Sequence, residues 1–195
     1  MNYQFKIQIK GITKPPVWRK IIVSEDITFA ELHEIIQCVF GWGNYHLYQF
    51  KDKEWGGEVL IAEPSDMDDM YFVDTLDANK LLLKHYFQRG AITKIFYEYD
   101  FGDSWIHTIT LESVEESPTN TPMCLDGKGA CPPEDCGGIY GYAHLKEIFE
   151  NTPTGKEAKN FREWLGLGNK ETWDAKKFDL DETNKFLSTY HDEFI

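Results

Sequence analysis

A β-hairpin in the middle of the chain limits the folds that are open to this sequence. Residues 94–99 (KIFYEY) and 105–114 (WIHTITLESV) are rich in β-branched and aromatic side chains, and DFGD, residues 100–103, separates them. Aspartate favours turns because its carboxylate bonds nearby backbone amides, and glycine adopts backbone conformations that other residues avoid. The segment therefore predicts two antiparallel strands around a tight turn.

More strands are expected before this hairpin, with one helix among them. Aromatic and aliphatic residues occupy alternate positions over residues 3–9, and this period of two predicts a half-buried strand. Further strands are expected over residues 17–23 and 45–50. Thr28 with Glu31 forms a capping box, so a helix should begin there, run to about residue 40 and stop at Gly41.

The second half of the chain has a different character. Residues 62–71 indicate an acidic loop and residues 76–86 a short helix, and a stretch rich in proline and glycine follows from residue 118 to residue 141. Helical patterns then cover residues 142–150, 156–165 and 181–190.

Strands before helices is the α+β pattern. We predict a twisted, mainly antiparallel sheet, with the helix of the N-terminal half and the C-terminal helices packed on it. The whole chain, residues 1–195, should form one domain, made of a strand-rich part (1–116), a Pro/Gly-rich loop (117–141) and a helical part (142–195).

Charge and cysteine content narrow the classes of function. The chain has 33 acidic and 20 basic residues, a formal net charge of −13, and residues 52–116 hold 15 of the acidic residues against 5 basic ones. This balance disfavours a broad nucleic-acid surface, which needs clustered lysine and arginine. No segment resembles a membrane helix or a signal peptide, and four cysteines without an export signal are typical of a cytoplasmic protein.

Several short motifs occur in a characteristic order. They are PVWR (residues 16–19), LH (32–33), GW (41–42), HL (46–47), YDFGDSWIH (99–107), PPEDCGG (132–138) and GY (141–142). Together they resemble the plasmid ORF-three-like family, which is also met as a passenger protein of insertion elements. The resemblance covers roughly residues 3–190 and implies an α+β fold and a mobile-element ancestry, without a mechanism.

Members of that family are sometimes labelled resolvase-like, but the residues argue against recombination here. Recombinases stabilise a pentavalent phosphate with several arginines, because negative charge develops on it. This chain has Arg19, Arg89 and Arg162, far apart in sequence, and only Arg19 lies in one of the motifs.

The motifs suggest one site, formed by the YDFGDSWIH hairpin, His46 and the PPEDCGG loop. The candidate binding residues are Arg19, Trp42, Asp100, Asp103, Trp105 and Asp135. Asp100 and Asp103 are also explained as turn residues that bond their own backbone, or as ion-pair partners of Arg19.

A metal centre is the alternative use of the same motifs. His46, His107, Asp100 and Asp103 are the candidate ligands, because imidazole with carboxylate suits zinc, manganese or iron, and Glu134 is the candidate general base. A histidine on an apolar strand face such as His107 is, however, more often a hydrogen-bonded core residue than a ligand. Cys124, Cys131 and Cys136 lack the paired spacing of a zinc ribbon, so reduced thiols are the default interpretation.

Three functions therefore remain open. The sequence favours a cytoplasmic binding or accessory protein. Its expected partner is a protein or peptide rather than nucleic acid, and no association with a membrane is expected. The alternatives are a metal-dependent hydrolase that uses the His/Asp cluster and a divalent metal, and a DNA-associated accessory factor, which rests on the family's genetic context alone.

Overall fold

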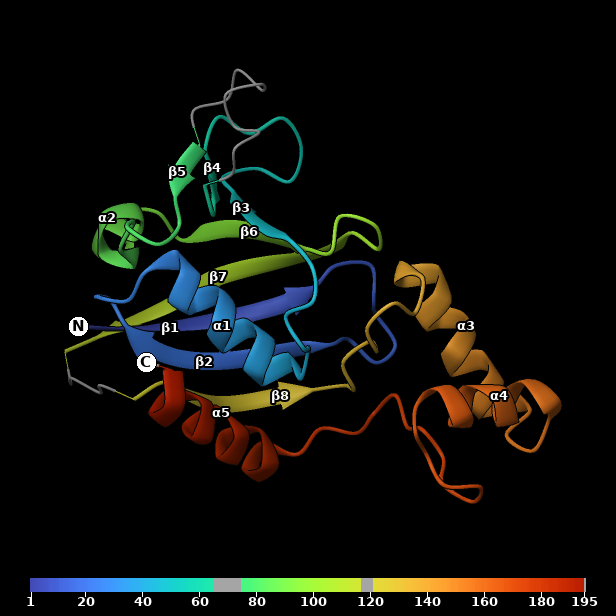
Figure 1. Cartoon of the computed structure of the whole chain (residues 1–195). Helices are drawn as coiled ribbons and strands as arrows, with labels where there is room; N and C mark the ends of the chain where they lie inside the picture. Colours follow the sequence, from blue (N-terminus) through green and yellow to red (C-terminus); the bar gives the residue numbers. More distant parts are fainter. Residues whose placement is uncertain (65–74, 117–120, 195) are drawn as a thin grey trace.

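The computed structural model describes residues 1–64, 75–116 and 121–194, in which strands and helices form an α+β fold (Figure 1). The strands are β1 (Asn2–Ile9), β2 (Trp18–Ser24), β3 (Tyr48–Lys51), β4 (Leu60–Ala62), β5 (Thr75–Asp77), β6 (Lys94–Tyr99), β7 (Trp105–Glu115) and β8 (Met123–Lys128). The helices are α1 (Phe29–Phe40), α2 (Leu83–Phe87) with a 3-10 turn, Gln88–Gly90, after it, α3 (Gly138–Asn151), α4 (Lys156–Trp164) and α5 (Leu180–Phe194).

The described strands form one sheet in the order β5-β4-β3-β6-β7-β1-β2-β8. Its neighbouring strands run antiparallel except β4 and β5, which are parallel. The alternation at the N-terminus is confirmed, because Tyr3, Phe5, Ile7 and Ile9 are all completely buried. The predicted α+β class and the mainly antiparallel sheet are therefore confirmed.

Helix α1 crosses one face of the sheet over β1 and β2 (Figure 1). Its capping box forms as predicted: Thr28 Oγ1 accepts from the Glu31 amide, and Glu31 accepts from the Thr28 amide. Gly41 ends the helix with φ +85°, a left-handed conformation that costs glycine little. Polar side chains of the helix reach the sheet as well, since His33 Nδ1 and Gln37 Nε2 lie 2.8 and 3.0 Å from Tyr97 Oη.

The predicted hairpin is present as β6 and β7, which pair from Lys94 with Thr110 to Tyr99 with Trp105. Strand β7 is also paired along its length with β1, so the hairpin forms the middle of the sheet. The DFGD turn therefore projects from one end of the central strands, whose positions are fixed by pairing with their neighbours in the sheet.

The Pro/Gly-rich region is more structured than a loop. Residues 123–128 form the edge strand β8, which pairs with β2, and α3 begins at Gly138 instead of residue 142. The prediction of a helix over residues 76–86 is also wrong in part, because residues 75–77 form β5 and the helix is limited to Leu83–Phe87. The acidic loop predicted over residues 62–71 lies mostly outside the described residues.

Helix α5 packs against β8 and α1, while α3 and α4 lie beyond the strand ends, on the side of the β6–β7 turn (Figure 1). The Asn184 side chain joins α5 to the edge strand by two hydrogen bonds of 2.8 Å with the backbone of Cys124. Its amide accepts from the Cys124 N–H and donates to the Cys124 carbonyl, as the backbone of a neighbouring strand would. Within the described ranges, no helix is long and apolar enough to cross a membrane.

Candidate functional site

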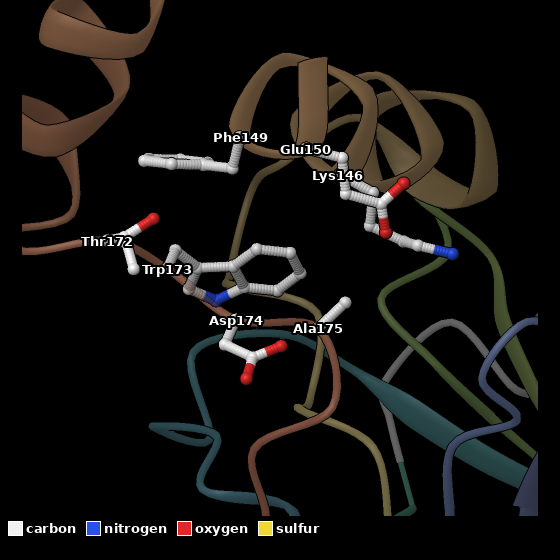
Figure 2. Close-up of a pocket in the computed structure, with 7 residues that line it drawn as sticks. All are labelled: Lys146, Phe149, Glu150, Thr172, Trp173, Asp174 and Ala175. Atoms are coloured by element: carbon white, nitrogen blue, oxygen red, sulfur yellow. The ribbon is translucent and has the colours of Figure 1, made fainter. Parts of the chain in front are cut away.

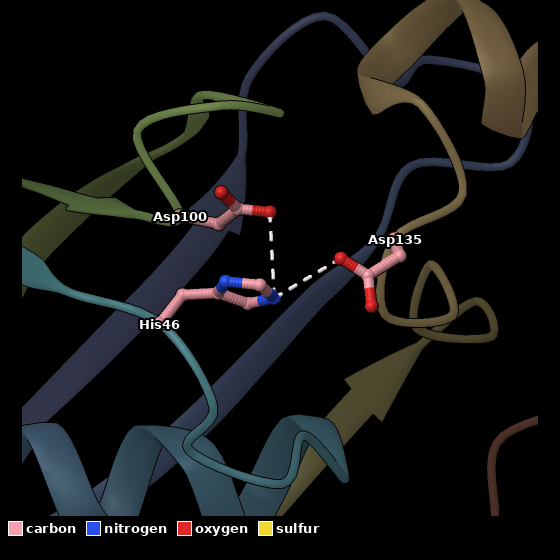
Figure 3. A group of neighbouring side chains, drawn as sticks. All are labelled: His46, Asp100 and Asp135. Atoms are coloured by element: carbon pink, nitrogen blue, oxygen red, sulfur yellow. Dashed lines mark ion pairs between the residues drawn. The ribbon is translucent and has the colours of Figure 1, made fainter.

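Three segments far apart in sequence meet at the end of the central strands. They are the loop after α1, the turn between β6 and β7, and the PPEDCGG loop before α3. Figure 3 shows His46, Asp100 and Asp135 from these segments pointing toward one another. His46 Nε2 lies 3.2 Å from Asp135 Oδ1 and 3.8 Å from Asp100 Oδ2, and Glu134 Oε2 lies 3.9 Å from the same nitrogen. We call these four residues the acidic cluster.

The loop that carries His46 is held by hydrogen bonds on both sides. Asn44 has a left-handed backbone with φ +55°, which asparagine tolerates well. Its side chain bonds His33 Nε2 at 2.8 Å and donates to Glu34 at 2.9 Å, while its amide donates to Gln37. This anchoring on α1 fixes the position from which His46 reaches the carboxylates.

Glu134 connects the PPEDCGG loop to the other two segments. Its Oε1 accepts from the Gly43 amide at 2.8 Å and from Tyr99 Oη at 2.9 Å. Trp42 Nε1 donates to the Pro132 carbonyl at 2.9 Å. Burial, and after it the hydrogen bond to Glu134, raises the pKa of Tyr99 well above its ordinary value of 10, so the hydroxyl remains a donor at neutral pH.

The two turn aspartates have structural partners of their own. Asp100 Oδ1 accepts from the Gly102 amide at 2.9 Å, which confirms its interpretation as a turn residue. Asp103 Oδ2 accepts from the Gly137 amide at 3.0 Å and so ties the turn to the PPEDCGG loop. Asp100 therefore presents its second oxygen to His46, whereas Asp103 serves the contact between loops.

The acidic cluster has unsatisfied polar atoms at its centre. His46 Nε2 and Glu134 Oε2 are both buried and have no hydrogen-bond partner in the described parts of the chain. Buried polar atoms normally find a partner, so such atoms call for an explanation. One ligand atom each from His46, Asp100 and Asp135 lies within 4.8 Å of the others. With three carboxylates around one imidazole, the arrangement can accept a cation or a cationic side chain.

His107 does not belong to the acidic cluster. It is completely buried, its Nδ1 bonds the Trp105 carbonyl at 2.8 Å, and its ring packs against Phe40, Trp42 and Tyr97. Burial lowers its pKa to about 3, so the ring is neutral at physiological pH. The core interpretation of His107 is the one that fits, and the predicted metal set of His46 with His107 does not come together. Trp105 is likewise fully buried.

Arg19 also lies apart from the cluster, and the suggested ion pair with Asp100 and Asp103 is wrong. Its guanidinium donates to the carbonyls of Val39, Trp18, Lys128 and Gly129 at 2.8, 2.8, 3.1 and 3.1 Å. These carbonyls belong to the end of α1 and to the β2–β8 edge. Arg19 therefore joins those elements and does not shape the hairpin turn.

The cysteines form no metal site in the described residues. No group of three ligand atoms that includes Cys124, Cys131 or Cys136 comes within 4.8 Å there. Burial raises the pKa of Cys124 to about 11 and that of Cys136 to about 12, so both remain thiols near neutral pH. These findings fit the default interpretation of reduced thiols.

Sequence reasoning did not single out Tyr99 as a site residue, and it did not single out the exposed residues Leu47, Phe101 and Tyr140. Tyr99 is the first residue of the YDFGDSWIH motif, which was the available signal. Tyr45, Leu47, Phe101 and Tyr140 are exposed, and Trp42 is buried in the core. Three of the exposed residues are chain neighbours of His46 or Asp100, and their positions gave no indication that they would remain outside the core.

Comparisons with known proteins agree with this architecture. The chain is 32% identical over 173 residues to an uncharacterized protein of Sinorhizobium fredii, covering 88% of this chain and 84% of that protein. It is similar to a crystal structure of a protein of unknown function from Methanosarcina mazei Go1, with a TM-score of 0.75, 33% identity and coverage of 93% and 96%. Residues 1–182 match the family described as Plasmid pRiA4b ORF-3-like protein, and the chain therefore belongs to this family.

Proposed function

We propose that the protein is a binding or accessory protein whose acidic cluster takes a lysine or arginine side chain of a protein partner. The observation that carries this proposal is the convergence of Asp100, Glu134 and Asp135 on His46 Nε2 at 3.2–3.9 Å. The cluster contains three carboxylates, and none of them has a lysine or arginine as an ion-pair partner among the described residues. A guanidinium fits such a site well because its planar fork bonds carboxylates through two parallel N–H groups.

The surroundings of the cluster favour a protein partner over a small cation. Tyr45, Leu47 and Phe101 are exposed and adjoin His46 or Asp100 in the chain, and the exposed Tyr140 lies in the first turn of α3. Exposed aromatic and aliphatic residues next to a charged site are typical of protein interfaces, in which tyrosine and phenylalanine are enriched. The expected partner segment therefore has a basic residue next to apolar ones.

Nucleic acid fits this face poorly. Phosphate groups are neutralised by clustered lysine and arginine, whereas this face presents carboxylates. The net charge of −13 adds a general repulsion. A basic protein segment is attracted by the same field, which would speed its association at low salt.

Selection from a random peptide library displayed on phage tests the proposal. The wild-type protein should enrich peptides that contain lysine or arginine beside aromatic or aliphatic residues. The Asp135→Asn variant should not retain them, because the Asp135 side chain is 70% exposed and its replacement removes charge without disturbing the core. Asp126→Asn, on the exposed face of β8, is the matched control. Failure to enrich peptides, or equal retention by Asp135→Asn, would contradict the proposal.

A divalent cation is the second candidate ligand, and one observation favours it. The ligand atoms of His46, Asp100 and Asp135 lie within 4.8 Å of one another, and imidazole with carboxylate suits zinc or manganese. Isothermal titration with zinc chloride or manganese chloride alone tests it. Stoichiometric binding that His46→Gln abolishes would support a metal centre, and a dissociation constant above about 1 mM would remove it.

A further inference from the structure

A groove at the C-terminal end of α1 contains a buried cation, Arg19, which is not part of the acidic cluster. The groove has a volume of about 500 Å³ and lies between the C-terminal end of α1, the first half of α5 and the segment that joins α4 to α5. Small-molecule sites in proteins commonly have volumes of 300–1,000 Å³ and mostly apolar walls. Phe40, Trp173, Phe178 and Phe186 supply much of the wall, and Arg19 lies among them.

The charge of Arg19 has no carboxylate partner in the described residues. Arg19 is 3% exposed. A guanidinium has five N–H donors, and the structure assigns four of them to backbone carbonyls. One N–H on Nη2 is therefore left over. A buried charge is usually paired, so this cation lacks the partner that burial calls for.

Aromatic rings fix the guanidinium in place. Its central carbon lies 5.0 Å from the centroid of the Phe40 ring and 4.3 Å from that of Phe178, so the cation lies between two apolar surfaces. The bond from Nε to the Val39 carbonyl places it at the C-terminal end of α1, where the helix dipole is negative. Part of the charge is balanced there, which explains how the residue remains buried without a ligand.

Trp173 gives the groove a firm wall. It also borders a second hollow of about 220 Å³ beside α3, where Figure 2 shows its indole ring near Phe149. The Trp173 ring packs at 6.2 Å from Phe149 and at 5.5 Å from Tyr142, both in α3. The Trp173 indole that borders the groove is therefore held in place by its contacts with α3.

The acidic residues of the groove limit the charge of a ligand. Asp174 accepts from the Lys176 amide, and Asp179 accepts from the Glu182 amide at the start of α5, so both carboxylates already have backbone partners. Glu182 is exposed, and Lys177 is the second cation of the lining. These carboxylates oppose a dianion such as a phosphate monoester, whereas a single negative charge needs only the Arg19 donor.

We propose that this groove binds an organic carboxylate with an apolar chain or ring, with its carboxylate at Arg19 and its apolar part along Trp173 and Phe186. This site is separate from the acidic cluster, and a ligand here goes beyond the proposed protein partner.

Isothermal titration with phenylbutyrate, indole propionate and octanoate, each against its alcohol analogue, tests the proposal. At least one carboxylate should bind saturably with a dissociation constant below about 1 mM, and its alcohol should bind at least about tenfold more weakly. The indole N–H signal of Trp173 should shift during the titration. Absence of binding by all three carboxylates, or equal binding by the alcohols, would overturn the proposal.

Two half-exposed phenylalanines provide a matched pair of variants. Phe186 in the groove is 52% exposed and Phe101 in the hairpin turn is 49% exposed, so neither replacement by alanine should unfold the protein. Phe186→Ala should weaken carboxylate binding about tenfold and Phe101→Ala should leave it unchanged. Equal affinities in the two variants would locate the ligand elsewhere. Arg19→Lys, if it folds, should also weaken binding, because lysine lacks the planar fork.

Discussion

The indole Nε1 of Trp42 donates a hydrogen bond to the carbonyl oxygen of Pro132, 2.9 Å away, and so joins the loop after α1 to the PPEDCGG loop. The two residues are 90 positions apart in the chain. This contact, with the hydrogen bonds of Glu134 to Gly43 and Tyr99, brings the carboxylates to His46. The acidic cluster thus depends on packing between loops as much as on the strands beneath them.

Replacing Trp42 by phenylalanine should destabilise the protein by about 1–3 kcal/mol, because the ring still packs but the buried Pro132 carbonyl loses its donor. Urea denaturation measures the change in the free energy of unfolding. Trp164→Phe is the control, since Trp164 lies half-exposed at the end of α4. A similar loss of stability in both variants would show that the Trp42–Pro132 hydrogen bond does not contribute measurably to the free energy of unfolding.

Removing the charge of Glu134 should destabilise the protein more than removing the charge of Asp135, although the two residues are chain neighbours with the same functional group. Glu134→Gln should cost about 1–3 kcal/mol, because Oε1 accepts from two donors and the half-buried site tolerates a wrongly placed amide poorly. Asp135→Asn should change stability by no more than about 0.5 kcal/mol, since the side chain is mostly exposed and asparagine tolerates its φ of +55°. Equal costs in thermal unfolding would contradict the separate roles of structure and binding.

Gly138 marks the contact between α3 and the hairpin turn. Its φ is +65°, and a Cβ there would lie 2.8 Å from the carbonyl oxygen of Asp103. Gly166 has a similar φ of +67° with open space around it, so Gly166→Ala should cost about 1–2 kcal/mol from backbone strain alone. Gly138→Ala should cost clearly more in chemical denaturation, because the backbone oxygen cannot move away without displacing the turn. Equal costs would mean that the two segments are not in contact.

Stability should decrease as the pH falls below about 6.5. Burial lowers the pKa of His33 to about 4 and that of His107 to about 3, from an ordinary value of 6.5. The unfolded chain therefore binds protons more readily than the folded one, and the free energy of unfolding should fall by about 1.4 kcal/mol per pH unit for each histidine between 6.5 and its folded pKa. Above pH 6.5 the full stabilising contribution of both neutral histidines is present.

Nuclear magnetic resonance of the imidazole rings isolates these two groups from the carboxylates that titrate at lower pH. The ring signals of His33 and His107 should stay at their neutral positions from pH 7.5 down to about 5, because both rings are held in the core. A midpoint near 6.5 for either ring would show that it is not buried as described.

Local patterns predicted the parts of the fold that short-range physics decides. The alternation from Tyr3 to Ile9, the capping box at Thr28 and the turn at Asp100 depend on residues close in sequence, and all three are present. Strand β8 was missed because its sequence, MCLDGK, includes a glycine and buries little beyond Cys124. Its strand conformation comes from pairing with β2, which the sequence around it does not reveal.

The candidate site followed the same division. The motifs marked His46, Asp100, Glu134 and Asp135 as neighbours, and these four come together. His107 was kept as a metal-ligand candidate although a histidine on an apolar strand face is more often a core residue, and it is a core residue here. The suggested ion pair of Arg19 with the turn aspartates was wrong, since the partners of Arg19 are backbone carbonyls, which a sequence pattern does not reveal.

The most direct test of the acidic cluster as a binding site is the affinity of one selected arginine peptide for the wild-type protein, Asp135→Asn and Asp126→Asn, measured by isothermal titration. The same peptide with citrulline in place of arginine keeps the shape and loses the charge. Arginine peptide binding should weaken about tenfold or more in Asp135→Asn and stay unchanged in Asp126→Asn, and the citrulline peptide should bind the wild type as weakly. Equal affinity of the arginine and citrulline peptides, or of all three proteins, would contradict a cation-binding role for the cluster.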